Sequence, residues 1–307
     1  MRVSVVVCTH TTDRYPDLRE AVESVLAGTY RDREVVVVSD GSEAVAALAR
    51  EDYADHDDVT VHLQSENRGL LAARNTGASV ASGDVVAFLD DDALADERWL
   101  EELVAAYDAD EDVRAAGGKM VPEWVAGKPT FLPAEFYWLV GVTHRGFADG
   151  PGEVRNTFGS NISFRAEVFE ALGGFDTNIG GRKGDRHLQG GETELCARLR
   201  DEYGAGVYYT PDALVAHKIF DYRTDPAWLV RRAFWQGYSK RGMEVFVPAS
   251  TGEEGAFLGD LLTDFVPSRL WDLLTGPSRT KALQLVTLVV LTAAVGFGYL
   301  YGYAKWR

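Results

Sequence analysis

The sequence is short of basic residues. It contains 31 lysine and arginine residues against 47 aspartate and glutamate residues, which gives a formal net charge of −16. A surface of this sign repels nucleic acid, so we expect no DNA or RNA partner. Because the acidic residues are spread along the chain, two interpretations stay open: adaptation to high salt, or a site for cationic partners.

Cysteine is also scarce, with Cys8 and Cys196 the two thiols of the chain. Two cysteines cannot form a disulfide framework, and neither stands in a spacing typical of a zinc site. We expect both to be small buried hydrophobic residues. An N-terminal export signal is lacking too, since the apolar run 3–7 is followed at once by CTHTTDR. The bulk of the chain is therefore expected in the cytoplasm.

One long run without charge is present, at the C-terminus. Residues 282–304, ALQLVTLVVLTAAVGFGYLYGYA, carry no charge over 23 residues. At 1.5 Å per residue a helix of this length measures about 34 Å, which is enough to cross a bilayer core. We predict a transmembrane helix over 282–304, with a buried core helix as the alternative. Basic residues flank both ends of this run, so the positive-inside rule does not predict the orientation of the helix in the membrane.

The segment before this run, residues 246–281, reads as amphipathic. Its apolar face would lie on the membrane surface or pack on the globular part of the chain. We expect it to be a membrane-proximal segment between residues 1–245 and the predicted transmembrane helix.

Apolar strands alternate with amphipathic helices in the first ninety residues. The helices are expected at 17–26, 43–51 and 69–82. Unbroken apolar strands in such an alternation predict an α/β fold with a mostly parallel sheet covered by helices. The strands are expected at 3–7, 34–40, 59–64 and 84–89.

Polar residues follow these strands at the sheet edge where ligands bind in α/β folds. Thr9 follows the first strand, Asp40 the second, and Asp90 to Asp92 the fourth. The sequence lacks G-x-G-x-x-G after the first strand and lacks G-x-x-x-x-G-K-[ST] throughout. A dinucleotide-binding Rossmann site and a P-loop are therefore excluded, and another kind of nucleotide-binding domain is favoured.

Three neighbouring carboxylates, Asp90, Asp91 and Asp92, need an explanation because like charges repel. Asp90 and Asp92 stand two apart on an extended segment, so their side chains point the same way. Mg²⁺ and Mn²⁺ bind one or two carboxylates together with substrate phosphates. We expect a divalent cation here; the alternative is a solvated acidic turn before the helix that begins near Glu97.

Seven motifs, in order along roughly residues 1–220, resemble the family 2 glycosyltransferases. They are VSVVVCTHTTDR, VVVVSDGS, ENRGLLAARNTG, GDVVAFLDDDA, GSNISFRAEVFEALGGFD, GETELCARLR and VAH. The resemblance implies the GT-A nucleotide-sugar-binding fold. It also implies sugar transfer from a nucleotide sugar with inversion, and Mg²⁺ or Mn²⁺ as cofactor.

The same resemblance implies roles for the residues of the donor side. Thr9 and Asp40 would contact the nucleotide base, with Asp40 accepting from uracil N3–H, and Arg74 would lie near the nucleotide. Asp90 and Asp92 would form the D-x-D motif, with Asp92 the direct metal ligand. Asp40 has a structural alternative as a turn residue, and Arg74 has one as a surface helix residue.

Two further positions are matched by the family. Asn161 would line the sugar or acceptor pocket, or alternatively satisfy a loop backbone. His217 would help hold the metal or the diphosphate, or alternatively be a hydrogen-bonded core residue.

The base position departs from the family pattern E-D-x-[DE]-L-x-x-R-L. In GGETELCARLR, Gly191 replaces the first glutamate and Glu192 stands where the family has its aspartate base. A carboxylate near an acceptor hydroxyl can take its proton. Glu192 is the first candidate base and Glu194 the second; alternatively both are first-turn residues stabilised by the helix dipole.

Acidic composition and an apolar C-terminus together resemble the haloarchaeal transferases that build N-glycans on dolichyl phosphate. This implies a cell-membrane enzyme whose catalytic domain, 1–245, faces the cytoplasm. The donor would be UDP-glucuronate and the acceptor a dolichyl-phosphate-linked sugar. Candidate partners of the hexuronate carboxylate are Arg182, Lys183 and Arg186; alternatively these are solvated loop charges. The alternatives are an exopolysaccharide or polyprenyl-phosphate glycosyltransferase, and a catalytically silent nucleotide-sugar-binding protein.

Overall fold

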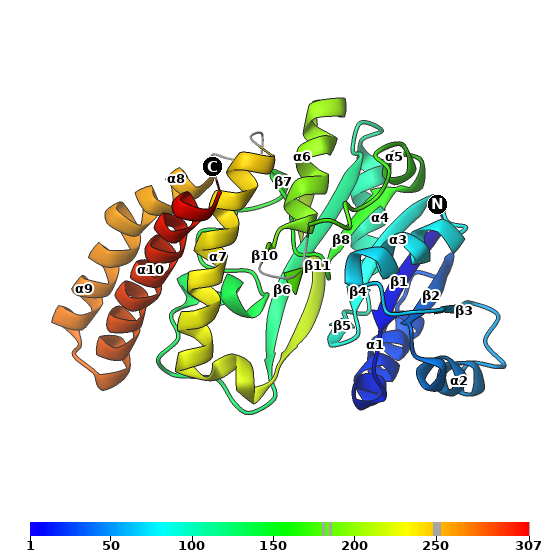
Figure 1. Cartoon of the computed structure of the whole chain (residues 1–307), viewed down its shortest axis with the longest axis horizontal. Helices are drawn as coiled ribbons and strands as arrows, with labels where there is room; N and C mark the ends of the chain where they lie inside the picture. The colour runs from blue at the N-terminus through cyan, green and yellow to red at the C-terminus, as the bar shows by residue number, and fades with distance from the viewer. Residues whose placement is uncertain (180–181, 184–185, 248–252, 307) are drawn as a thin grey trace. The chain divides into compact units, whose positions relative to one another are not determined.

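The chain divides into two compact units in the computed structural model, which describes residues 1–179, 182–183, 186–247 and 253–306 (Figure 1). The first unit comprises Met1–Val121, Gly150–Gly180 and Gly191–Lys218. The second comprises Pro122–Asp149, Gly181–Gly190 and Ile219–Arg307. The division of the chain at residues 245 and 281 that the sequence suggests stays a prediction.

The first unit begins with the alternation that the sequence predicts. Strands β3, β2, β1 and β4 lie side by side in this order, and each neighbouring pair is parallel. A short 3-10 turn, Thr12–Arg14, precedes the first α-helix. The elements are β1 (Val3–Thr9), α1 (Tyr15–Ala27), β2 (Arg33–Asp40), α2 (Glu43–Asp52), β3 (Val59–Gln64), α3 (Leu70–Val80) and β4 (Val85–Asp90).

The remaining strands make the sheet mixed rather than mostly parallel, which corrects one part of the sequence-based expectation. β8 is antiparallel to β4 and β6, and β5 and β7 are antiparallel to β11. Parallel neighbours need a crossover helix, and the Val-rich alternation that supplies one ends after β4. These elements are β5 (Ala93–Ala95), α4 (Trp99–Ala109), β6 (Ala115–Trp124), β7 (Gly152–Val154), β8 (Ile162–Arg165), α5 (Ala166–Ala171), α6 (Gly191–Tyr203) and β11 (Val207–Ile219).

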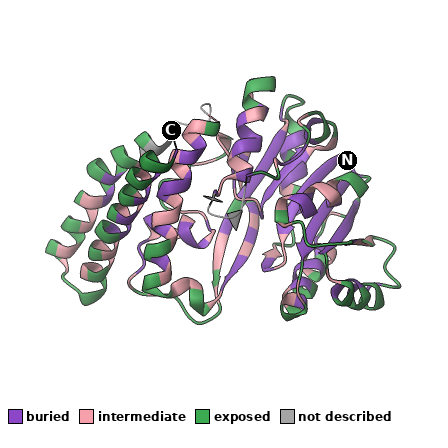
Figure 2. Ribbon diagram, viewed as in Figure 1, coloured by how far each residue is buried: buried purple, intermediate pink, exposed green. Residues whose placement is uncertain are grey.

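The core of the first unit lies on the parallel strands, where every residue of β1 and β2 is buried (Figure 2). Val6, Phe88 and Ala73 join Leu195 of α6 in one hydrophobic cluster. Burial of each such aliphatic or aromatic side chain stabilises the fold by roughly 1.5–3 kcal/mol. Both cysteines are free thiols within this cluster, which confirms the expectation of buried small residues.

The second unit is mainly helical. It contains η2 (Ala134–Val140), β9 (Arg182–Lys183), β10 (Arg186–His187), η3 (Asp221–Thr224), α7 (Pro226–Phe246), α8 (Glu253–Asp260), the π-helical η5 (Leu261–Phe265), α9 (Val266–Thr275) and α10 (Arg279–Lys305). The side chains of Arg182, Lys183 and Arg186, candidates for contacting a hexuronate, lie outside the described part of the chain. By length and composition, α10 can cross a membrane.

Candidate functional site

The ends of three neighbouring strands bring the predicted donor-side residues to one edge of the sheet. The strand register pairs Thr9 with Ser39, and it pairs Asp90 with Cys8, the residue before Thr9. Asp40 pairs with Gln64 at the end of β3. Thr9, Asp40 and Asp90 therefore meet at the carboxyl edge of the parallel strands, as the sequence predicts.

Asp40 is buried and organises the loop that leads into α3. Its Oδ1 accepts from the Arg68 N–H at 2.8 Å and from Nε2 of Gln64 at 3.3 Å, while Oδ2 accepts from the Gly69 N–H at 2.8 Å. Gly69 has φ of 89°, which favours glycine at this bend. An ionised carboxylate offers about four acceptor sites, so a fourth donor, such as a base N–H, can still be accommodated.

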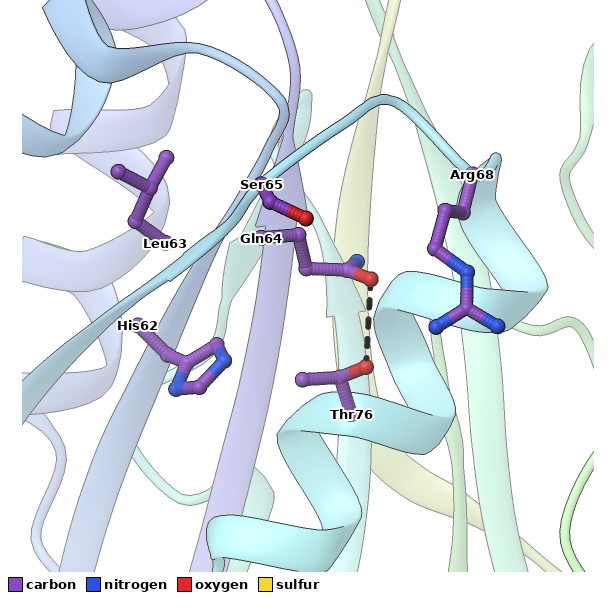
Figure 3. Close-up of a pocket in the computed structure, with 6 residues that line it drawn as sticks. All are labelled: His62, Leu63, Gln64, Ser65, Arg68 and Thr76. Atoms are coloured by element: carbon purple, nitrogen blue, oxygen red, sulfur yellow. Dashed lines mark hydrogen bonds between the residues drawn. The ribbon is translucent and has the colours of Figure 1, made fainter.

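A pocket of about 400 Å³ lies next to these residues (Figure 3). Gln64 links it to Asp40, and Oε1 of Gln64 accepts from the Thr76 hydroxyl of α3 at 3.4 Å (Figure 3). The wall of the pocket thus includes a residue bonded to Asp40, which the sequence analysis expects to contact a nucleotide base. The pocket is lined by His62, Leu63, Gln64, Ser65, Arg68 and Thr76.

Arg74 is the central side chain of the site, and it is not a surface residue. Its side chain is 2% exposed; Nη2 donates to Oδ1 of Asp90 at 2.7 Å and Nη1 to Oε1 of Glu192 at 2.8 Å. Burial disfavours the guanidinium charge, but the Asp90 and Glu192 carboxylates outweigh this and raise the pKa of Arg74. One buried cation thus joins the D-x-D motif to the candidate base, 118 residues from Arg74 in sequence.

Gly159 makes room for this bridge, and Gly191 makes room for Leu71. A Cβ on Gly159 would lie 2.0 Å from Oε1 of Glu192 and 2.6 Å from Nη1 of Arg74. At Gly191, which replaces the usual family glutamate, a Cβ would lie 2.6 Å from Cδ1 of Leu71. Leu71 is partly buried and packs against the hydrophobic cluster, so a side chain at position 191 would require Leu71 to shift.

The two candidate bases differ in their surroundings, although both stand in the first turn of α6. The Glu192 side chain is 26% exposed and bonds Arg74 through Oε1 alone. Glu194 is buried and accepts from Nε and Nη2 of Arg198, at 2.5 and 2.7 Å. Arg198 also donates to the carbonyls of Leu172 and Gly174, so Glu194 belongs to a separate ion pair that ties α6 to the loop after α5.

Asp92 and His217 meet because β11 pairs with β5. His217 is the register partner of Ala93, and the Lys218 N–H donates to the Asp92 carbonyl at 2.9 Å. Nε2 of His217 consequently lies 3.3 Å from Oδ1 of Asp92, and both side chains are buried. Arg14, which the sequence analysis did not single out, donates through Nη2 to Oδ2 of Asp92 at 3.0 Å.

The three consecutive carboxylates are therefore separated by different partners. Asp90 bonds Arg74, while Asp92 bonds Arg14 and contacts His217. Burial raises the pKa of Asp91 to about 7; Asp92 and Asp90 add to this, and the Thr9 hydroxyl and Arg14 oppose it. Asp92 is buried, so it is not a solvated turn residue, whereas the Asp90 side chain is 29% exposed.

A divalent cation at this edge of the sheet would need oxygen or nitrogen ligands from the protein. Within the described ranges, no group of three or more His, Cys, Asp or Glu side chains is arranged to hold a metal by protein ligands alone. A cation that shares its coordination with phosphates and water needs one or two protein ligands. Asp92 and His217 meet this requirement, and Asp90 is held by Arg74 instead.

Asn161 is fully buried, and its amide is used within the protein. Oδ1 accepts from Nε1 of Trp99 at 2.8 Å and from the Gly118 N–H at 3.1 Å. Nδ2 donates to the carbonyls of Lys119 and Ala213, at 3.2 and 2.9 Å. These contacts agree with the alternative interpretation, in which the Asn161 amide hydrogen-bonds backbone groups of the protein.

Comparison with known proteins identifies relatives of this chain. The model of the family "Glycosyl transferase family 2" matches residues 4–173. The chain is 50% identical to the glucosyl-dolichyl phosphate glucuronosyltransferase of Haloferax volcanii, over 98% of this chain and 96% of that protein.

Solved structures show the same fold at low sequence identity. The mannosyltransferase PcManGT from Pyrobaculum calidifontis, in complex with GDP-Man and Mn²⁺, gives a TM-score of 0.60 at 20% identity, covering 98% of this chain and 87% of that one. S. aureus TarS 1-349 in complex with UDP-GlcNAc gives 0.55 at 16% identity, covering 100% of this chain and 92% of that one. The GT-A fold expected from the sequence is thus confirmed.

Proposed function

Because the chain belongs to glycosyltransferase family 2, we propose that it moves a sugar from a nucleotide sugar to a lipid-linked acceptor with inversion at the anomeric carbon. The observation that carries this proposal is the Arg74 bridge, which holds Asp90 and Glu192 at 2.7 and 2.8 Å. The bridge brings a donor-side carboxylate and an acceptor-side carboxylate into one site. Such proximity is what a direct displacement between two bound substrates requires.

The donor is proposed to lie across the carboxyl edge of the parallel strands. Its base would enter the pocket beside Gln64 and bond Asp40, which holds the pocket-forming loop in place. Asp92 and His217 would hold a divalent cation, which when bound stabilises negative charge on the departing diphosphate. Arg14 lies 3.0 Å from Asp92 and supplies a further positive group at this place.

Glu192 is proposed as the base. It takes the proton of the acceptor hydroxyl while that oxygen bonds to the anomeric carbon. The bond from that carbon to the diphosphate oxygen breaks, and its electron pair leaves with the nucleotide. Attack opposite the leaving group inverts the configuration, and no covalent intermediate on the protein is needed.

The proposed substrates are UDP-glucuronate as donor and a dolichyl-phosphate-linked glucose as acceptor. The support is the 50% identity to the Haloferax volcanii enzyme over 98% of this chain. Glu192, with Oε1 bonded to Arg74 and a side chain 26% exposed, is accessible to an acceptor hydroxyl. The apolar C-terminal helix supports a membrane location, where enzyme and lipid acceptor share one surface and their effective concentration rises.

The test is transfer by the purified full-length chain with a panel of labelled nucleotide sugars and a short-chain polyprenyl-phosphate glucose, followed by mass spectrometry. Addition of a hexuronate from UDP-glucuronate supports the proposal. Addition of another sugar would show that the donor is wrong. Donor binding without transfer from any nucleotide sugar would instead identify a catalytically silent binding protein.

A further inference from the structure

The C-terminal helix α10 is packed lengthwise on α7 within the second unit (Figure 1). A Cβ on Gly298 would lie 1.8 Å from the Phe234 carbonyl oxygen, and one on Gly237 would lie 1.9 Å from the Val295 carbonyl oxygen. The two backbones thus approach as closely as small residues allow. The buried stripe of α10 consists of Leu288, Leu291, Ala294, Gly298 and Gly302.

Both ends of α10 are attached to the same unit. Near its start, Gln284 donates to the Thr130 carbonyl at 2.9 Å and accepts from Nη1 of Arg269 at 2.8 Å. At its end, Trp306 packs against Tyr238 of α7 with ring centroids 5.3 Å apart. From 284 to 306 a helix rises about 33 Å. A helix crossing a bilayer would carry its two ends to opposite faces of a hydrocarbon core about 30 Å thick.

The partner helix α7 is poorly suited to accompany α10 through a bilayer. Arg241 stacks on the Tyr303 ring of α10 at 3.9 Å, and Tyr299 donates to Glu244 at 2.8 Å. Each basic residue placed at the centre of a membrane helix costs about 2.5–3.5 kcal/mol on the insertion scale. The basic residues of α7 are Arg231, Arg232, Lys240 and Arg241.

Exposed residues on α9 and α10 (Figure 2) include many large apolar side chains, beside an exposed charge on α9, Asp272. On α9, Trp271 is 67% exposed and Leu274 is 78% exposed, whereas Arg269 turns inward to Glu135. Glu135 is fully buried between Arg269 and Arg145, which attaches α9 firmly to the unit. Exposed apolar faces of this kind mark a contact with a partner or a membrane.

We propose that α9 and α10 lie in the plane of a lipid bilayer surface, with their outer faces buried at the boundary between headgroups and acyl chains. The chain would then be a monotopic membrane protein. This differs from the transmembrane helix that length and composition predict for 282–304, because the contacts of Gln284 with Thr130 and Arg269, and of Trp306 with Tyr238, attach both ends of α10 to the same unit.

Lipid is favoured over a second protein copy by the chemistry of the outer face. No charged residue occurs between Lys281 and Lys305, whereas protein interfaces carry about one hydrogen bond per 100–200 Å². Two exposed tyrosines, Tyr301 and Tyr303, stand near the end of α10, where aromatic residues are common at a membrane–water interface.

Depth measurements test the proposal directly. Val286, Ala293 and Leu300 are exposed and seven residues apart, so all three lie on one face of α10. Each is replaced singly by cysteine and spin-labelled in the full chain, in phosphatidylcholine–phosphatidylglycerol vesicles; the native thiols are buried. Collision with oxygen and with a water-soluble nickel chelate reports depth. A Leu48→Cys variant, labelled on α2 of the first unit, is the control without lipid contact.

An in-plane helix gives three similar shallow depths of about 5–10 Å. A spanning helix gives a middle label deeper than both outer ones by about 10 Å, since seven residues rise about that far, and this would overturn the proposal. No lipid contact at any label, together with a dimer in sedimentation, would identify a second copy as the occupant and also overturn it.

Sidedness gives an independent measurement. Thr280→Cys and Lys305→Cys place exposed thiols at the two ends of α10. In sealed vesicles carrying the full chain, a membrane-impermeant maleimide should label both to the same extent as Leu48→Cys. Labelling of one end and protection of the other would show that α10 spans the bilayer. This outcome does not depend on which sugar the enzyme transfers.

Discussion

Glu192 and Glu194, two residues apart in the first turn of α6, should respond differently to loss of their charge. Glu192→Gln keeps the size of the side chain but removes the group that accepts the proton. General-base catalysis contributes about 10²–10⁴-fold, so transfer should fall by this factor, or about 3–5 kcal/mol of transition-state stabilisation. Arg74 still donates to the amide oxygen and to Asp90, so the free energy of unfolding should change by no more than about 1 kcal/mol.

Glu194→Gln should affect folding rather than catalysis. Glu194 is 6% exposed and makes two hydrogen bonds to Arg198. Breaking a buried ion pair costs about 3–5 kcal/mol. The Arg198 side chain is 31% exposed and keeps two carbonyl acceptors. We therefore expect the free energy of unfolding to fall by about 2 kcal/mol, less than for a fully buried charge that loses its partner. The folded fraction should transfer sugar at the wild-type rate within a few-fold.

Three measurements separate these effects: labelled-sugar transfer under saturating substrates, donor affinity by calorimetry, and thermal unfolding. Glu51→Gln, on the exposed surface of α2, is the matched control and should leave all three unchanged. The base assignment is refuted if Glu192→Gln keeps more than a tenth of the transfer rate. It is equally refuted if folded Glu194→Gln binds donor normally but transfers no sugar.

Three further predictions concern the metal, the glycine beside the base and a buried carboxylate. Asp92→Ala should lose the gain in donor affinity that Mg²⁺ or Mn²⁺ gives the wild type, so that calorimetry with and without a chelator gives equal affinities. Gly159→Ala should lower transfer at least tenfold while the melting temperature stays within a few degrees, because its Cβ would meet Oε1 of Glu192 at 2.0 Å. Glu34 is buried, yet hydrogen bonds from Ser4 and neighbouring groups outweigh burial and lower its pKa. Stability from this group is therefore present above its unfolded pKa of about 4.3 and is lost as pH falls below it. Denaturation as a function of pH should show Glu34→Gln about 1–2 kcal/mol less stable at neutral pH, with the difference shrinking in acid; a constant difference would contradict this reasoning.

Local pattern was sufficient to predict the strands and helices of the first ninety residues. The run 59–64 is strand β3 to the residue, and the Val-rich runs are the parallel strands. The spacing of the apolar residues predicts which residues are buried. Strands that are apolar on both faces are typical of a parallel sheet covered by helices on both sides. The same pattern predicted that Asp40 and Asp90 lie at one sheet edge, because parallel strands end together.

Pairings between distant segments could not be read from any local pattern. Arg74 resembles a surface helix residue in sequence, and its burial depends on carboxylates that α6 and β4 bring to it. Likewise, no motif in the sequence marks Arg14 as a site residue. Its hydrogen bond to Asp92 joins residues 78 positions apart in the chain.

The sequence by itself determined the α/β alternation, the family motifs and an apolar helix long enough for a membrane, since these depend on residue order and local periodicity. Only the tertiary structure decided that Glu192 bonds Arg74 while Glu194 bonds Arg198, and that α10 packs along α7. Periodicity describes which face of an element is apolar, but the partner of that face is chosen by the packing of the whole chain.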